Sequence, residues 1–167
     1  VEAHLLHDET LTETNKQRFA ALAAQFGQSI SYHDASALGN SIDLKGQSSV
    51  SFLSPAAVYR LFLPEILPHL SRAIYLDADT VVDMDLAEMW GQDLRGFPLG
   101  AVPDLGVQRA LYVTGRDAAC DLWANGAMAR WRELDIPLER YFNSGSLLMD
   151  LDGIRRDKLF AATLDFI

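Results

Sequence analysis

An apolar run that ends in two closely spaced carboxylates is the feature that most constrains this chain. Residues 74–82 have the sequence IYLDADTVV, so Asp77 and Asp79 follow directly on a short hydrophobic segment. Such a segment predicts a buried strand. Side chains at positions i and i+2 of a strand point to the same side, so the two carboxylates can converge on one hard cation through oxygen ligands. The alternative is that both aspartates only cap a turn.

Composition fits a single domain and excludes some classes of function. The 167 residues are 49% hydrophobic, which is enough for a sizeable core. There are 23 Asp and Glu against 14 Lys and Arg, a net charge of −9, and no basic cluster, so nucleic acid is not an expected partner. An anionic ligand would be repelled unless a divalent cation linked it to the aspartates. No apolar run reaches the length of a membrane span, and the single Cys120 fits a reducing compartment.

The order of expected elements is α/β. We expect strands at 1–6, 29–33, 74–76, 99–102 and 147–151, with helices between them. Thr10 and Glu13 have the spacing of a capping box for a helix that ends before Gly27.

Further helices are expected after the residues Ser54, Asp85 and Asp152, each of which is a suitable N-cap. The helix after Ser54 should be broken into short turns by Pro64 and Pro68. Residues 35–51 are rich in Ser, Gly and Asn and predict a loop.

Two further blocks accompany the acidic pair. Residues 59–68 have the sequence YRLFLPEILP, and residues 141–151 have the sequence YFNSGSLLMDL. Together with residues 74–82, they resemble glycosyltransferase family 8, the retaining enzymes that include bacterial lipopolysaccharide galactosyl- and glucosyltransferases and glycogenin. The resemblance covers nearly the whole chain, in the family's order and spacing. It implies a GT-A type nucleotide-diphospho-sugar transferase fold, with a mixed central sheet flanked by helices, in one domain over residues 1–167.

Both ends of the chain look cut. The first residues already form a strand-like segment, and the last residues lie in an apparent helix without a stop signal. In the family, an earlier strand carries much of the nucleotide-base pocket and a later region carries a metal-ligating histidine, and neither motif occurs here. We therefore expect an internal fragment of a larger enzyme, truncated at both ends and inactive in isolation.

The resemblance assigns a donor and metal site to the acidic strand end. Asp77 and Asp79 match the family's metal-binding motif, and the implied cofactor is Mn²⁺ or Mg²⁺. With Ala78 between them, these residues match the segment that binds the donor diphosphate. The cation would act as a Lewis acid on the departing nucleoside diphosphate.

Three other residues match catalytic positions of the family. Arg60 matches an arginine that reaches the donor sugar and phosphates, for which a planar guanidinium is suited, and a surface salt bridge is the alternative. Asn143 matches an amide that contacts the transferred hexose, and a turn Asn before Gly145 is the alternative. Asp104 resembles an aspartate near the acceptor side of the cleft, and an ordinary residue at a strand end is the alternative.

The remaining chemistry-bearing residues are expected to be structural. His4, His7, His33 and His69 show no paired metal-ligand spacing. Trp90, Trp123 and Trp131 are expected in the core or at its rim. Residues 105–138 correspond to the part of the family that varies most and builds the acceptor site, so the acceptor itself is not identified.

The function implied by the resemblance is metal-dependent transfer of a hexose, with retention of configuration, from a UDP-sugar to a glycan or lipid-linked, lipopolysaccharide-type acceptor. Glucose and galactose are the expected hexoses. A cytoplasmic location is expected, peripheral to the inner membrane through other regions.

Two alternative functions remain. One is a sugar-nucleotide-binding relic without activity. The other is a phosphatase of the haloacid dehalogenase type, whose first motif also fits residues 76–81 and would make Asp77 a nucleophile. Against the phosphatase, roughly 70 residues of α/β sequence precede a motif that normally opens its domain, and the later acidic metal pair and well-placed lysine of that superfamily are missing.

Overall fold

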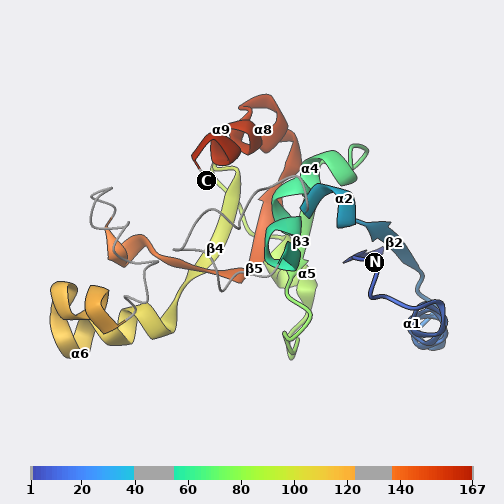
Figure 1. The fold of residues 1–167 in the computed structure, drawn as a ribbon, viewed down its shortest axis with the longest axis horizontal. Coiled ribbons are helices and arrows are strands. Elements are labelled where there is room, and N and C mark those ends of the chain that lie inside the picture. The colour runs from blue at the N-terminus through green and yellow to red at the C-terminus, as the bar shows by residue number, and fades with distance from the viewer. Residues whose placement is uncertain (1, 40–54, 123–136, 167) are drawn as a thin grey trace.

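The N-terminal unit is a parallel strand pair with one crossover helix. The computed structural model describes residues 2–39, 55–122 and 137–166 (Figure 1). Strand β1 (Ala3–His7) pairs in parallel with β2 (Ile30–Asp34), with Ala3 opposite Ile30. Parallel strands need a crossover connection, and α1 (Glu13–Gln25) provides it. We call β1, α1 and β2 the N-terminal unit.

A second sheet is antiparallel and carries the acidic strand end. It consists of β3 (Arg72–Leu76), β4 (Leu99–Pro103) and β5 (Phe142–Asp150), in the order β3-β5-β4. Leu148 of β5 lies opposite both Ile74 of β3 and Gly100 of β4. The long helix α6 (Leu105–Leu122) follows β4 and, in Figure 1, projects to the side opposite the N-terminal unit. The predicted α/β class is confirmed, and its parallel and antiparallel pairings are divided between two sheets.

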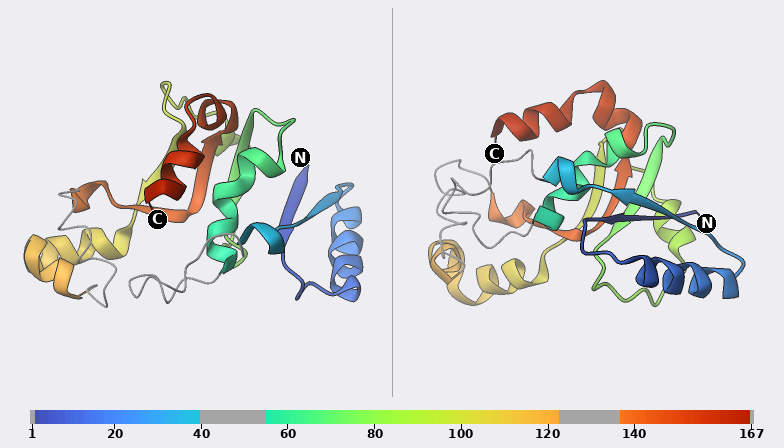
Figure 2. Two further views of the ribbon diagram at one scale, coloured as in Figure 1. Left: turned by 45° about the horizontal axis from the view of Figure 1, so that its top comes forward. Right: turned by 45° about the vertical axis from the view of Figure 1, so that its right-hand side comes forward.

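The hydrophobic core lies where α4 (Leu63–Ile66) and α8 (Leu151–Arg156) meet β5. Figure 2 shows α8 next to the end of β5, with α9 (Leu159–Phe166) following it. The buried members of this core are Leu63, Leu67, Leu147, Met149, Leu151 and Ile154. Leu6 of β1 packs against the same cluster, so the core also holds the N-terminal unit.

Arg155 ties two helical segments of the core together. Its guanidinium donates to the carbonyl oxygens of Pro64 (2.7 Å) and Leu70 (2.6 Å), and to the carboxylate of Asp152 (2.6 Å). These carbonyls lie in α4 and in the turn after it, where helical hydrogen bonding has ended. Arg155 therefore supplies hydrogen bonds to backbone acceptors at α4 and in the turn after it.

The remaining described elements are short. They are α2 (Ser36–Gly39), α3 (Pro55–Val58), η2 (Tyr59–Phe62), α5 (Leu86–Trp90) and η3 (Leu138–Arg140). The predicted helix from residue 55 is therefore present as three short turns, α3, η2 and α4. Pro64 lies in the first turn of α4, where its missing N–H is not needed. No described helix has the length and apolar character needed to span a bilayer.

Two predicted helix caps were wrong. Thr10 does not cap α1, because its backbone N–H and hydroxyl both donate to Asp8, which forms a turn before the helix. Thr12 is the N-cap instead, and its side chain accepts a hydrogen bond from Asn15 N (3.3 Å). Likewise Asp152 does not cap the helix after β5.

Asp150 caps α8 in place of Asp152, because β5 ends one residue earlier than predicted. Its carboxylate accepts a hydrogen bond from Gly153 N (2.9 Å). The predicted cap Asp85 is confirmed, with an acceptor contact to Ala87 N (2.8 Å). The predicted loop at 35–51 contains α2 near its start. The rest of that loop lies outside the described residues, and so do Ser54, Trp123 and Trp131.

Three histidines that are far apart in the sequence meet at the N-terminal unit, two of them in its strands. Nδ1 of His4 lies 3.0 Å from Nε2 of His33, and the ring centroids of His4 and His69 are 6.3 Å apart. Burial lowers the pKa of His33 below its ordinary value, and the neighbouring His4 and His69 lower that pKa further. Sequence spacing does not reveal this group, because β1, β2 and the turn after α4 bring its members together.

We expect the free energy of unfolding to fall as pH drops below the ordinary histidine pKa of 6.5. The unfolded chain then binds a proton at His33 more readily than the folded chain. The contribution of His33 to stability is therefore fully present above pH 6.5 and decreases as the pH falls below it. Chemical denaturation between about pH 7.5 and 5.5 measures the slope, which His33→Gln should reduce. The pKa values of the Asp8 and Asp34 carboxylates are lowered from 3.8, so these groups change the stability only at more acidic pH. An equal slope in His33→Gln would contradict this explanation.

Candidate functional site

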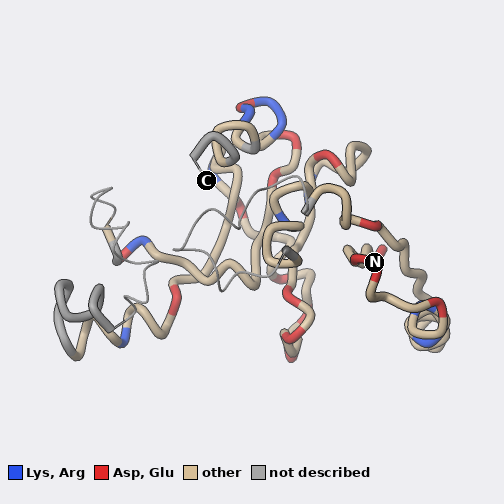
Figure 3. Tube along the Cα trace, in the orientation of Figure 1, with Lys and Arg blue, Asp and Glu red and all other residues tan. Residues whose placement is uncertain are grey.

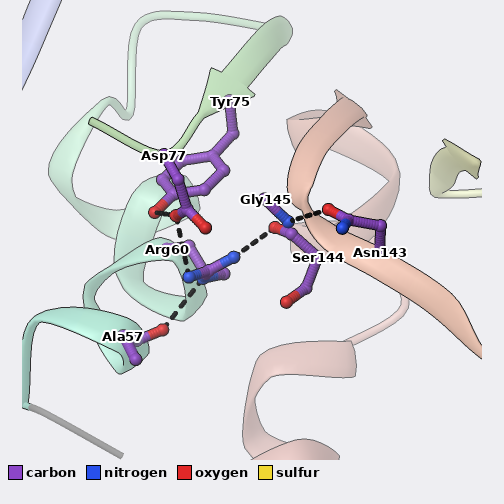
Figure 4. Close-up of polar contacts among 7 residues, drawn as sticks. All are labelled: Ala57, Arg60, Tyr75, Asp77, Asn143, Ser144 and Gly145. Atoms are coloured by element: carbon purple, nitrogen blue, oxygen red, sulfur yellow. Dashed lines mark hydrogen bonds and ion pairs between the residues drawn. The ribbon is translucent and has the colours of Figure 1, made fainter. Parts of the chain in front are cut away.

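Asp77 lies opposite Gly145 at the end of the β3–β5 ladder. Leu76 is paired with Ser146, and the N–H of Asp77 donates to the carbonyl oxygen of Gly145 (2.8 Å), which extends the pairing by one residue. The sequence block at 74–82 and the block at 141–151 therefore meet at one point, shown in Figure 4. Asp77 is half-buried there, with its side chain 33% exposed.

Arg60 brings the third sequence block to the same point. It lies in η2, and its side chain is only 13% exposed. Nη2 donates to Oδ1 of Asp77 (2.9 Å), Nη1 donates to the carbonyl oxygen of Ser144, and Nε donates to the carbonyl oxygen of Ala57 (2.9 Å) (Figure 4). Arg60 does form a salt bridge, as its predicted alternative role requires, but the bridge is half-buried and joins α3 and β5 to the end of β3. Its contact with a donor stays a prediction.

Tyr75 is a site residue that sequence reasoning missed. Its hydroxyl donates to Oδ1 of Asp77 (2.6 Å), and the guanidinium carbon of Arg60 lies 4.7 Å from the centre of its ring. Burial, and then the hydrogen bond to Asp77, raises the pKa of the phenol, so Tyr75 stays a proton donor in neutral solution. Its position two residues before Asp77 was the available signal, since i and i+2 share one side of a strand.

Gly145 and Asn143 form the opposite wall of the site. Oδ1 of Asn143 accepts a hydrogen bond from the N–H of Gly145 (2.8 Å), which is the turn arrangement considered as the alternative for this residue. The side-chain amide of Asn143 is exposed and keeps its N–H groups as donors. A Cβ at position 145 would lie 2.7 Å from Oδ2 of Asp77, so only glycine leaves this carboxylate oxygen accessible.

Asp79 and Ala78 lie in the turn after Asp77. The turn is closed by a hydrogen bond from Thr80 N to the carbonyl oxygen of Asp77 (3.0 Å). Both residues are exposed, and the Asp79 carboxylate has no hydrogen bond or ion pair to residues 2–39, 55–122 or 137–166. Asp79 is thus a free carboxylate beside one that is held in place.

The donor set fits a hard divalent cation that is completed by a ligand. No group of three His, Cys, Asp or Glu side chains with metal-site geometry occurs in the described residues. Mg²⁺ and Mn²⁺ are commonly held by one or two carboxylates together with substrate phosphates. Asp77 and Asp79 would supply the two carboxylates, and the missing side chain of Gly145 leaves room at Oδ2 of Asp77.

Asp104 has a structural role in the described part of the chain. Its carboxylate accepts a hydrogen bond from Val107 N (3.0 Å) at the start of α6, and its own N–H donates to the carbonyl oxygen of Tyr141 (3.1 Å). No described contact joins Asp104 to Asp77, Arg60 or Asn143. Its predicted catalytic role stays a prediction.

The turn after β3 is strongly acidic. Asp77, Asp79, Asp83 and Asp85 lie within nine residues there. Figure 3 shows acidic positions in red along the loop that joins β3 to α5 in Figure 1. Arg60 is the described cation in contact with this group. A polyanionic ligand would therefore need an additional cation to lie here.

A hollow with a volume of about 710 Å³ lies elsewhere, between β1, α1 and η2. Its lining is mainly apolar, with Leu5, Leu11, Phe19 and Leu22, and it reaches Tyr59 next to Arg60 without including Asp77. The hollow is also lined by the polar residues His7, Asp8, Thr10, Asn15 and Arg18. We place the candidate site at the acidic pair because hydrogen bonds from three separate sequence blocks converge there.

Comparison with protein families identifies one that spans the chain. The sequence profile of glycosyl transferase family 8 matches residues 1–167. General stress protein A of Bacillus subtilis is 24% identical over 163 residues, which is 96% of this chain and 49% of that protein. Probable galacturonosyltransferase 4 of Arabidopsis thaliana is 46% identical over 55 residues, which is 33% of this chain and 9% of that protein. The chain thus spans about half or less of the length of these relatives.

Solved structures confirm the predicted GT-A type fold. The galactosyltransferase LgtC, solved in complex with donor and acceptor sugar analogs, has a TM-score of 0.67 at 20% sequence identity. The match covers 100% of this chain and 66% of that one. The bifunctional glycosyltransferase WbbM has a TM-score of 0.69 at 16% identity, with 99% of this chain and 34% of that one covered.

Proposed function

The chain belongs to glycosyl transferase family 8, and we propose that it carries the donor site of a metal-dependent, retaining hexosyltransferase. The observation that supports this most directly is the meeting of three separate sequence blocks at Asp77. Arg60, Asp77 and Ser144 are joined by hydrogen bonds although up to 84 positions separate them in the sequence. If Asp77 only capped a turn, hydrogen bonds from three separate sequence blocks would not need to meet there.

The proposed donor is a UDP-hexose, with glucose or galactose as the sugar. A bound Mn²⁺ or Mg²⁺ would neutralise the charge that develops on the departing diphosphate. Asp77 and Asp79 would hold it, and the N–H groups of Asn143 would donate to sugar hydroxyls. The acidic turn (Figure 3) supports the need for a cation, because its carboxylates would repel a diphosphate that has no cation bound. Direct contacts of Arg60 and Ala78 with the donor remain part of the proposal.

The acceptor side of the proposal is broader. We propose a glycan or lipid-linked, lipopolysaccharide-type acceptor, bound with the help of the segment that starts with α6, and a cytoplasmic location. Asp104 at the start of α6 is the proposed acceptor-side residue. Retention of configuration is proposed from family membership.

One alternative function remains. Family membership leaves the haloacid dehalogenase phosphatase without support. A sugar-nucleotide-binding relic would keep the same site and differ only in turnover, so activity has to be measured on the intact protein.

The test is a donor panel assayed on the intact protein with and without Mn²⁺. UDP-glucose, UDP-galactose and UDP-galacturonic acid are compared, the last because of the plant relatives named for galacturonosyl transfer. We expect UDP release from one of the two hexose donors with Mn²⁺, loss of release in excess chelator, and recovery when Mn²⁺ is restored. Nuclear magnetic resonance of the product should show the donor's anomeric configuration.

Other results would contradict separate parts of the proposal. Full turnover in excess chelator would contradict the metal role, and use of only the uronic acid donor would contradict the hexose. Tight UDP binding without turnover on any donor would favour the relic.

A further inference from the structure

The two oxygens of the Asp77 carboxylate are used differently. Oδ1 accepts hydrogen bonds from both Tyr75 Oη (2.6 Å) and Arg60 Nη2 (2.9 Å). Oδ2 accepts no hydrogen bond from the described residues and lies next to the position that a side chain at Gly145 would fill. Figure 4 shows the phenol and the guanidinium on the same oxygen. The carboxylate therefore has one oxygen fixed by the protein and one left over.

Tyr75 is itself held rigidly enough to act as a fixed donor. It is the second-last paired residue of β3, opposite Leu147 of β5, so the ladder sets its backbone. Arg60 lies over its ring at 4.7 Å and is anchored at its other nitrogens by the carbonyl oxygens of Ala57 and Ser144. Both donors on Oδ1 thus come from side chains that are anchored by further contacts.

We propose that Tyr75 is a positioning residue for cation binding, which with Arg60 fixes Oδ1 of Asp77 so that Oδ2 is the oxygen available to the metal. This inference rests on the proposed function. A carboxylate without these donors can rotate, use both oxygens or turn away, whereas the fixed carboxylate presents one oxygen in one orientation. Partners that orient metal ligands in this way commonly change metal affinity about 10- to 100-fold when removed.

The decisive variant is Tyr75→Phe, which removes the hydroxyl and keeps the ring under Arg60. We expect the dissociation constant of Mn²⁺ to rise about tenfold in the intact protein with saturating UDP, measured by electron paramagnetic resonance of free Mn²⁺. A crystal structure of metal-free Tyr75→Phe should show Asp77 in a second orientation. Arg60→Lys keeps the charge but loses the fork of donors, and it should weaken Mn²⁺ binding in the same direction.

Tyr32→Phe is the matched control. This substitution also removes one partly buried phenol hydrogen bond, which Tyr32 donates to the carbonyl oxygen of Lys16 (2.7 Å). Tyr32 lies in β2, away from Asp77. The two Phe variants should have similar melting temperatures, and only Tyr75→Phe should change Mn²⁺ affinity.

The possible outcomes separate the inference from the proposed function. Wild-type affinity for Mn²⁺ in Tyr75→Phe, or an equal loss in Tyr32→Phe, would overturn the positioning role alone. Absence of Mn²⁺ binding in the wild-type protein with UDP would overturn the metal-dependent function and this inference with it.

Discussion

Replacing Asp79 with Asn is expected to lower sugar transfer by the intact protein at least about 10³-fold, equivalent to about 4 kcal/mol of transition-state stabilisation. Asp79 is exposed and makes no described hydrogen bond or ion pair, so the substitution removes one charge from the proposed metal site without disturbing a structural contact. The melting temperature should stay at the wild-type value. Steady-state kinetics at saturating Mn²⁺ and circular dichroism measure the two expectations.

Asp83→Asn provides the matched control for this experiment. Asp83 is exposed in the same acidic turn, so its replacement changes the net charge equally without touching the proposed ligands. We expect near wild-type transfer from it. If both variants lost activity to the same degree, the general charge of the turn would explain the effect and ligation by Asp79 would not.

The sequence was informative where a local pattern decides the structure. The strand before Asp77 and the cap at Asp85 follow from hydrophobic runs and capping preferences over a few residues, and both are present. The caps at Thr10 and Asp152 were wrong because a competing Asp8 turn and the end of β5 decide between equally suitable residues. A local pattern cannot choose between such neighbours.

Prediction of the candidate site needed tertiary structure more than prediction of the strands and caps did. A resemblance of motifs could select Arg60 and Asn143, but it could not show that Arg60 uses each of its nitrogens on protein acceptors. Nor could it show that a phenol shares Oδ1 of Asp77 with that arginine. Both facts depend on the register of β3 against β5 and on the position of η2, which the sequence does not encode locally.

The arrangement around Asp77 also explains why a glycine belongs at position 145. The carboxylate is held on one side by Tyr75 and Arg60, so moving away from a new group on its other side would disturb these two contacts. Its backbone is also fixed, because Asp77 N is bonded to the carbonyl oxygen of Gly145 itself. A side chain at 145 would therefore compete directly with a bound cation for the space at Oδ2.

Gly145→Ala is accordingly expected to lower metal-dependent transfer about 10- to 100-fold. The added Cβ would lie 2.7 Å from Oδ2 of Asp77 and 3.1 Å from Oδ1 of Asn143, so both of these polar groups must shift. The expected signature is a raised Mn²⁺ requirement, measured as the metal concentration that gives half-maximal rate.

Gly100→Ala tests whether the effect is specific to the site. Gly100 lies in β4 of the same sheet, and a Cβ there would also meet an atom at 2.7 Å, but that atom is the end of the flexible Leu94 side chain. Both variants should lose some thermal stability through crowding, and only Gly145→Ala should need more Mn²⁺. An unchanged Mn²⁺ requirement in Gly145→Ala would mean that the space beside Oδ2 is not where the cation binds.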